Sequence, residues 1–174
     1  VDLVEGFYTG DSLNHKSLLR YQMRDFSDAQ SQPIPVPFPD QWSSSIPYGY
    51  IPTDISICRV STVSTAVIQG ILQNEDPRLS TMYAMLGQAA GSITVPYWPV
   101  GNTPEVANGS YTAPLCDMAI DIRDMLYDCG QCSYCIDTYK LKDDNGDGLW
   151  PCTFQAENSI LDSVQVLLNE WRMA

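Results

Sequence analysis

Two short motifs in the last third of this 174-residue chain carry most of its potential chemistry. In the first, Asp143, Asn145 and Asp147 have the spacing of the first three oxygen ligands of a Ca²⁺ loop. The twelfth position of such a loop, where a bidentate glutamate is usual, is Phe154, and Glu157 would reach the ion only by a different loop path. The motif therefore predicts either a Ca²⁺ site or a polar turn rich in Asn, Asp and Gly.

The second motif is Cys129-Gly-Gln-Cys132-Ser-Tyr-Cys135. Zinc would need a fourth ligand, which Cys116 or Cys152 would have to supply, but the usual second CxxC or histidine pair is absent. An iron–sulfur cluster would need a fourth thiolate at a recognised spacing, and the chain has none. The even number of cysteines favours disulfides over a metal site or free thiols. The expected disulfide partners are all six cysteines, in a pairing that the sequence does not reveal: Cys58, Cys116, Cys129, Cys132, Cys135 and Cys152.

The rest of the chain offers little for catalysis. Its one histidine, His15, is far from any GxSxG-like segment, which disfavours Ser-His-Asp and Cys-His sites. Arg59 is a candidate contact for an anion or carboxylate, and equally for a salt bridge. Asn108 begins an Asn-Gly-Ser sequon, a glycosylation site in a host that glycosylates. The sequence assigns no catalytic residue to this chain.

Charge and hydropathy narrow the classes of partner. With 21 acidic and 9 basic residues the formal net charge is −12, which disfavours binding to nucleic acid or anionic membranes. No apolar stretch reaches the roughly 18–20 residues that span a bilayer. Residues 1–6 lack the basic and apolar regions of a signal peptide, and we expect the numbering to begin inside a larger precursor or after processing. Acidity and cysteine content together favour an exported protein.

Hydrophobic spacing predicts three helices, over residues 12–28, 114–128 and 154–172. The first would place Arg24 away from its apolar face. The residues expected on the apolar face of this helix are Leu19, Met23 and Phe26.

Alternating and β-branched residues predict strands over residues 54–60, 61–72 and 79–86. The turn signal of residues 74–77 joins the last two as an antiparallel pair, and residues 93–100, interrupted by prolines, form at best an edge strand.

Three further segments are expected to be irregular or short. Residues 32–40 alternate proline with apolar residues, which predicts an extended strip packed onto its own domain in preference to an SH3-type ligand. Residues 41–53 are expected to be irregular, and residues 139–141 to end a strand. The order of helix, antiparallel strands, helix and helix predicts an α+β fold in a single domain over residues 1–174.

Several segments taken together resemble the C-terminal part of the N-terminal-nucleophile (Ntn) hydrolases. The most similar branch is the acyl-coenzyme A:6-aminopenicillanic acid acyltransferase-like group of linear amide hydrolases. The resemblance covers about residues 12–100, and it depends on the order of its segments. These segments are Tyr21-Gln22-Met23-Arg24-Asp25-Phe26, Ser56-Ile57-Cys58-Arg59, Ser61-Thr62-Val63-Ser64-Thr65-Ala66-Val67-Ile68, and Met85-Leu86-Gly87 leading into Pro96-Tyr97-Trp98-Pro99.

The resemblance implies that this chain lacks the catalytic nucleophile and supplies part of the scaffold. Enzymes of this family cleave themselves to expose a Cys, Ser or Thr whose own α-amine is the general base. Val1 has no nucleophilic side chain, so the nucleophile is expected upstream or on a partner chain, and this chain would supply part of an αββα sandwich. Arg59, Tyr97 and Trp98 would then be walls of the substrate pocket.

A second class of function also fits the sequence. The chain would then be a non-catalytic extracellular module that assembles with itself or a partner, stabilised by disulfides and Ca²⁺. Half of a sandwich would expose a sheet edge and an apolar sheet face, and both are templates for association with another chain.

Overall fold

The computed structural model describes residues 14–27 and 34–173. A three-stranded antiparallel sheet in the order β2-β3-β4 forms the centre of the fold. Its strands are β2 (Ser64–Gln69), β3 (Thr81–Leu86) and β4 (Thr94–Tyr97). The α+β class and the antiparallel sheet predicted from the sequence are therefore confirmed.

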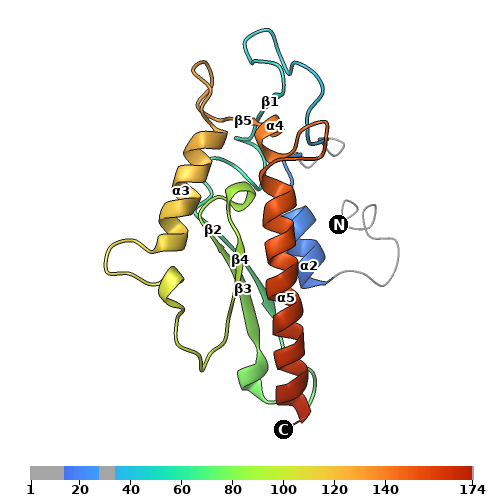
Figure 1. Ribbon diagram of the computed structural model, residues 1–174, viewed down its shortest axis with the longest axis vertical. Coiled ribbons are helices and arrows are strands. Elements are labelled where there is room, and N and C mark those ends of the chain that lie inside the picture. The colour runs from blue at the N-terminus through green and yellow to red at the C-terminus, as the bar shows by residue number, and fades with distance from the viewer. Residues whose placement is uncertain (1–13, 28–33, 174) are drawn as a thin grey trace.

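Helices lie on both sides of this sheet (Figure 1). The long helix α5 (Leu149–Met173) runs along one side, with the short helix α2 (His15–Ser17) and the π-helical turn η1 (Leu18–Gln22) next to it. Helix α3 (Pro114–Leu126) lies on the other side. The predicted helices at the middle and end of the chain are confirmed, although α5 begins five residues before the expected residue 154.

A second, smaller sheet caps one end of the molecule. Strand β1 (Tyr50–Pro52) pairs antiparallel with β5 (Cys135–Asp137), so the expectation that all of residues 41–53 are irregular is wrong. Helix α4 (Thr138–Leu141) follows β5 directly, where the sequence predicted a strand end. The helix begins there because the Asp137 side chain accepts a hydrogen bond from the Tyr139 N–H at 3.0 Å and caps it.

The first predicted helix ends earlier than expected, and Arg24 is buried instead of lying on the polar side. Helical structure ends at Gln22, while residues 12, 13 and 28 lie outside the described part of the chain. Leu19 and Phe26 are buried, as predicted. Arg24, expected on the polar side, is also buried, because a carboxylate of α5 faces it in the interior.

The predicted strand over residues 54–60 is wrong. Ile55 and Ile57 are exposed, and this segment forms bends that hydrogen bond locally. Ser56 Oγ donates to the Thr53 carbonyl at 2.9 Å, and Thr62 Oγ1 donates to the Ile57 carbonyl at 2.9 Å. Serine and threonine side chains compete in this way with ladder pairing.

Short 3₁₀ helices and turns complete the connections. The turn predicted at residues 74–77 is confirmed, with Asn74 at φ 71° and Asp76 capping η2 (Pro77–Leu79). Two further 3₁₀ helices are η3 (Ala89–Gly91) and η4 (Glu105–Ala107).

The proline-alternating strip packs onto its own chain, as predicted. Ile34, Val36 and Phe38 are half-buried against the main apolar cluster, whereas Gln32 and Pro33 lie outside the described residues, as do residues 1–6. That cluster runs continuously from Leu19 through both sheets to Leu168. In the described part of the chain, no helix combines the length and apolar character needed to cross a membrane.

Candidate functional site

The three-stranded sheet has one face that is covered throughout. Side chains alternate between the faces of a strand, so Val67, Tyr83 and Met85 share the face that looks toward α5. All three are buried. The ring of His15 stacks on Tyr83 at 4.4 Å between centroids, which accounts for the only histidine as a packing residue, and burial lowers its pKa.

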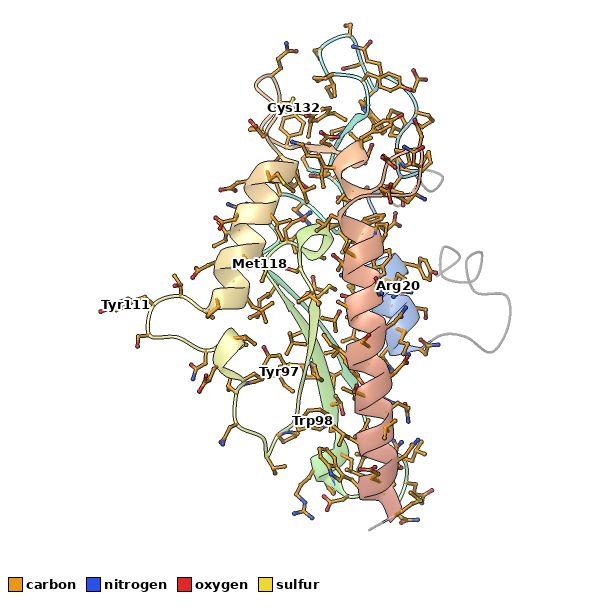
Figure 2. The ribbon with its side chains drawn as sticks, viewed as in Figure 1. Arg20, Tyr97, Trp98, Tyr111, Met118 and Cys132 are labelled. Atoms are coloured by element: carbon orange, nitrogen blue, oxygen red, sulfur yellow. A yellow bond between two sulfur atoms is a disulfide. The ribbon has the colours of Figure 1, made fainter. Side chains whose placement is uncertain are left out.

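The opposite face is apolar and partly open. We define the open face by five residues that alternate with the buried set: Ala66, Ile68, Met82, Val95 and Tyr97. The first three are exposed and the last two are half-buried, while Ala84 on the same face is buried. Ile68 and Met82 are directly opposite each other and are 70% and 38% exposed. Figure 2 shows Tyr97 on the side of the sheet away from α5, with Met118 of α3 above it.

Helix α3 covers this face only at one end. There Gly87, at the end of β3, meets Ala119 of the helix so closely that an added Cβ would lie 2.7 Å from the alanine methyl. Both edges of the sheet are also unpaired, since β2 and β4 each have only β3 as a neighbour among the described strands. Large contiguous apolar patches are uncommon on monomers and mark interaction surfaces, and an unpaired edge strand is a template for pairing with another chain.

A buried ion pair fixes the covered side of the sheet. Arg24 and Glu157 form two hydrogen bonds, of 2.7 and 3.1 Å, and their side chains are 0% and 2% exposed. Arg24 also donates to the carbonyls of Ala89 and Ser92 at 2.9 and 2.8 Å, and to that of Leu19 at 3.4 Å. Glu157 in turn accepts from the N–H and hydroxyl of Thr94 at 2.9 and 2.8 Å. The pair therefore joins three separate parts of the chain.

The ion pair bears on whether Glu157 could be a ligand of the calcium loop. Glu157, considered above as a substitute ligand, is committed to Arg24 and Thr94 inside the core. It is a structural carboxylate, so its use as a Ca²⁺ ligand is a prediction that the structure corrects.

A second buried polar cluster surrounds Cys58. The Gln88 amide nitrogen donates to the Cys58 carbonyl at 3.2 Å and to the Tyr127 hydroxyl at 3.1 Å. Thr53 Oγ1 and the Tyr127 hydroxyl share a hydrogen bond of 2.9 Å. Burial raises the pKa of Cys58 to about 12 and also raises that of Tyr127. The raised pKa disfavours the thiolate, which is the nucleophilic form of cysteine, and Cys58 packs as a buried member of the main apolar cluster.

We expect the Cys58 cluster to make the protein sensitive to alkaline pH. The unfolded thiol, with a pKa of 9.0, loses its proton above pH 9, while the folded thiol keeps it to about 12. The stabilisation is complete below pH 9 and is lost as the pH rises toward 12. Urea unfolding should show a loss of about 1 kcal/mol from this thiol between about pH 9 and 10. Cys58→Ala should reduce this slope, whereas exposed Cys152→Ala should keep it; equal slopes for both variants would contradict the assignment.

Only two of the six cysteines are bonded. Cys132 and Cys135 form a disulfide, and the expectation that all six pair is not met, because the other four are free in the structure. Cys58 is enclosed by the Gln88 cluster. The remaining free cysteines are Cys116, Cys129 and Cys152.

The calcium motif forms a closed polar turn. Asp143 Oδ1 accepts the N–H groups of Asn145 and Asp147 at 2.8 and 2.9 Å, and the Asp143 N–H donates to the Asp147 carbonyl at 2.7 Å. The Asp147 N–H is the main cause of the lowered pKa of Asp143. Across the described residues, no group of three or more His, Cys, Asp or Glu side chains has a metal-binding arrangement. Calcium binding at Asp143, Asn145 and Asp147 stays a prediction.

The three residues proposed as pocket walls are not brought together. Tyr97 is opposite Met82 near one end of β3, whereas Arg59 is exposed and precedes Ser64, which pairs at the other end of β3. Trp98 packs edge-to-face against Trp171 of α5, with ring centroids 5.5 Å apart.

A hollow of about 580 Å³ borders Trp171, where the turn after β2 meets the end of α5. Two ion pairs on its rim, Arg172 with Glu75 and Arg78 with Asp76, already satisfy its charges. Its lining therefore offers no free charged group for recognising a substrate.

The sequon residue Asn108 is exposed just after η4, in a position open to modification. Glycosylation there stays a prediction.

Comparisons of the chain with protein-family models, curated proteins and solved structures found no match. The functional argument therefore depends on the residues and their geometry.

Sequence reasoning expected an exposed apolar sheet face but did not identify its residues, and it missed the buried ion pair. A signal for the open face was present, since Ile68 and Met82 alternate with Val67 and Tyr83, which makes both faces apolar. Strands that are apolar on both faces are typical of sheets covered on both sides. No local signal marked the pair of Arg24 and Glu157, which are 133 residues apart.

Proposed function

We propose that this chain is the structural, downstream part of an exported Ntn-type amide hydrolase or acyltransferase. Its catalytic nucleophile would lie on a partner chain or on an upstream segment of the same precursor. The open face is the observation that carries this proposal. In an αββα sandwich two sheets pack face to face with helices outside, so each sheet needs one helix-covered face and one apolar face.

Two features of the sheet support this role. Its buried face is held to α5 by hydrogen bonds between Glu157 and Thr94, so α5 forms a helix layer on that side, while α3 covers only one end of the other. Ile68 and Met82 on the opposite face are apolar and exposed, as a sheet-packing layer requires. Export is proposed on the Cys132–Cys135 disulfide, because disulfides persist in oxidising compartments.

The competing function is a non-catalytic module that assembles with copies of itself. The unpaired outer edges of β2 and β4 favour it, because a second copy can extend a sheet by edge pairing. The two functions differ in what the open face should contact.

Intact-mass analysis of the protein isolated without denaturation distinguishes them. The hydrolase function requires either a companion chain that begins with Cys, Ser or Thr or the same nucleophile within one longer chain, together with activity on linear amides. A preparation that contains only copies of this chain and lacks amide hydrolysis would overturn the proposal and favour self-assembly.

Substitutions on the open face provide a sharper test. We expect Met82→Lys to remove the companion chain and the amide hydrolysis together, because a lysine ammonium would be buried without a partner in the contact. The matched control is Val166→Lys, at an exposed position of α5, which should keep both the companion chain and the amide hydrolysis. Thermal unfolding of each isolated variant should stay near that of the parent chain, since both positions are exposed. Retention of the companion by Met82→Lys would place the contact elsewhere.

A further inference from the structure

Three cysteines occupy corresponding positions in two consecutive turns. The Cys132 N–H donates to the Cys129 carbonyl at 3.2 Å, and the Cys135 N–H donates to the Cys132 carbonyl at 3.3 Å. The second turn carries the disulfide, with its Cα atoms 5.4 Å apart. A turn closed in this way holds its end Cα atoms within about 7 Å, and disulfides span about 4.4–6.8 Å. The backbone therefore holds Cys132 at a bridging separation from both of its neighbours.

The three sulfurs differ in their access to solvent. Cys132 and Cys135 are 7% and 0% exposed in a small apolar cluster with Ile46. Cys129 packs against the same cluster but is only half-buried, and it borders a shallow hollow beside Tyr127. Cys129 is therefore the one of the three that carries a free thiol, and that thiol is partly accessible to solvent.

We propose that Cys132 is shared between two alternative disulfides and that Cys129 is the thiol that exchanges them. The Cys129 thiolate attacks Cys132 Sγ and forms the new sulfur–sulfur bond. The Cys132–Cys135 bond breaks, and its electron pair leaves on Cys135, which takes up a proton. One proton is lost at Cys129 and one is gained at Cys135, so the exchange needs no oxidant or reductant.

Exchange would change whether the free thiol of this motif is accessible to solvent. In the bonded pair Cys132–Cys135, the free thiol is the accessible Cys129. After exchange the free thiol is Cys135, which lies inside the β1–β5 sheet opposite Pro52. The motif thus alternates between a state with a reactive surface thiol and a state in which that thiol is concealed.

Counting thiols in single variants tests this directly. The parent chain, equilibrated in a buffer of reduced and oxidised glutathione and denatured with an alkylating reagent, should show four free thiols. Cys135→Ser keeps five cysteines, and we expect three of them to be free because Cys129 now bonds Cys132. Cys129→Ser should also show three free thiols, and Cys132→Ser should show five. Five free thiols in Cys135→Ser would overturn the proposal.

A trapping experiment on the parent chain keeps the proposal testable if Cys135→Ser does not fold. The native protein is held at rising pH, quenched in acid, denatured and alkylated, and then cleaved after Tyr134 to separate Cys135 from the other two cysteines. Label on Cys135 should appear at the expense of label on Cys129, and faster at higher pH because the thiolate is the attacking form. Label confined to Cys129 at every pH would show that no exchange occurs.

Discussion

Replacing Arg24 by Met should lower the free energy of unfolding by about 3–5 kcal/mol, because it leaves the Glu157 carboxylate buried without its partner. The side chain of Glu157 is 2% exposed, so water cannot take the place of the guanidinium. The Ser92 carbonyl also loses the Arg24 donor, and the Ala89 carbonyl keeps only the longer bond from the Ser92 N–H, at 3.4 Å. Urea unfolding followed by circular dichroism measures the change.

The double variant Arg24→Met with Glu157→Leu separates loss of the pair from loss of its surroundings. Removing both charges avoids the unpaired carboxylate, so we expect the double variant to be more stable than the sum of the single effects, by about 0.5–3 kcal/mol. It should remain less stable than the parent chain, since the Thr94 N–H and the Ser92 carbonyl lose the partners that Glu157 and Arg24 supplied.

The control for this experiment is the pair of Lys16 and Asp162, whose side chains are 39% and 69% exposed. Asp162→Ala should change the free energy of unfolding by less than about 1 kcal/mol, because water screens an exposed pair. An Arg24→Met effect as small as that of Asp162→Ala would show that the interior around Arg24 is hydrated.

The elements that the sequence predicted well are those whose spacing is regular over many residues. Helix α3 lies within one or two residues of its expected ends, since its apolar residues follow helical spacing after Pro114. Helix α5 begins at Leu149, before its expected start. Pro151 does not prevent this, since it falls in the first turn, where a proline is tolerated.

The errors have two physical sources. Ile55 and Ile57 alternate with polar residues as in a strand, but the Ser56 hydroxyl donates to the Thr53 carbonyl and the segment bends. Strands β1 and β5 are too short to show a period, and Tyr50 pairs with Asp137 far along the chain. Pairing of this kind depends on tertiary packing, which a local pattern does not contain.

The candidate site divides in the same way. The calcium motif, the sequon and the CxxC pair are local patterns, and the sequence identified the residues of each. The open face, the Cys58 cluster and the Arg24–Glu157 pair arise from contacts between distant segments. The open face was nevertheless implied once β2 and β3 were paired, because their register places Ile68 opposite Met82.

Replacing Gly87 by Ala should destabilise the chain by about 2–5 kcal/mol, which combines a strained backbone with an overpacked contact. Gly87 has φ +86°, a conformation that side chains rarely adopt. Its added Cβ would also lie 2.7 Å from the Ala119 methyl of α3, so the helix would have to move away from the end of β3. The free energy of unfolding in urea measures the effect.

Two further variants show whether the contact with α3 is the cause. Gly70→Ala, where an added Cβ has no atom within 4 Å, should be neutral or slightly stabilising, because alanine restricts the unfolded chain. Adding Ala119→Gly to Gly87→Ala should relieve the contact but not the positive φ, so stability should recover in part. Because glycine inside a helix itself costs about 0.5–1 kcal/mol, the double variant is compared with Ala119→Gly alone. If Gly87→Ala costs as much in that background as in the parent chain, the cost comes from the backbone of Gly87 and not from its contact with α3.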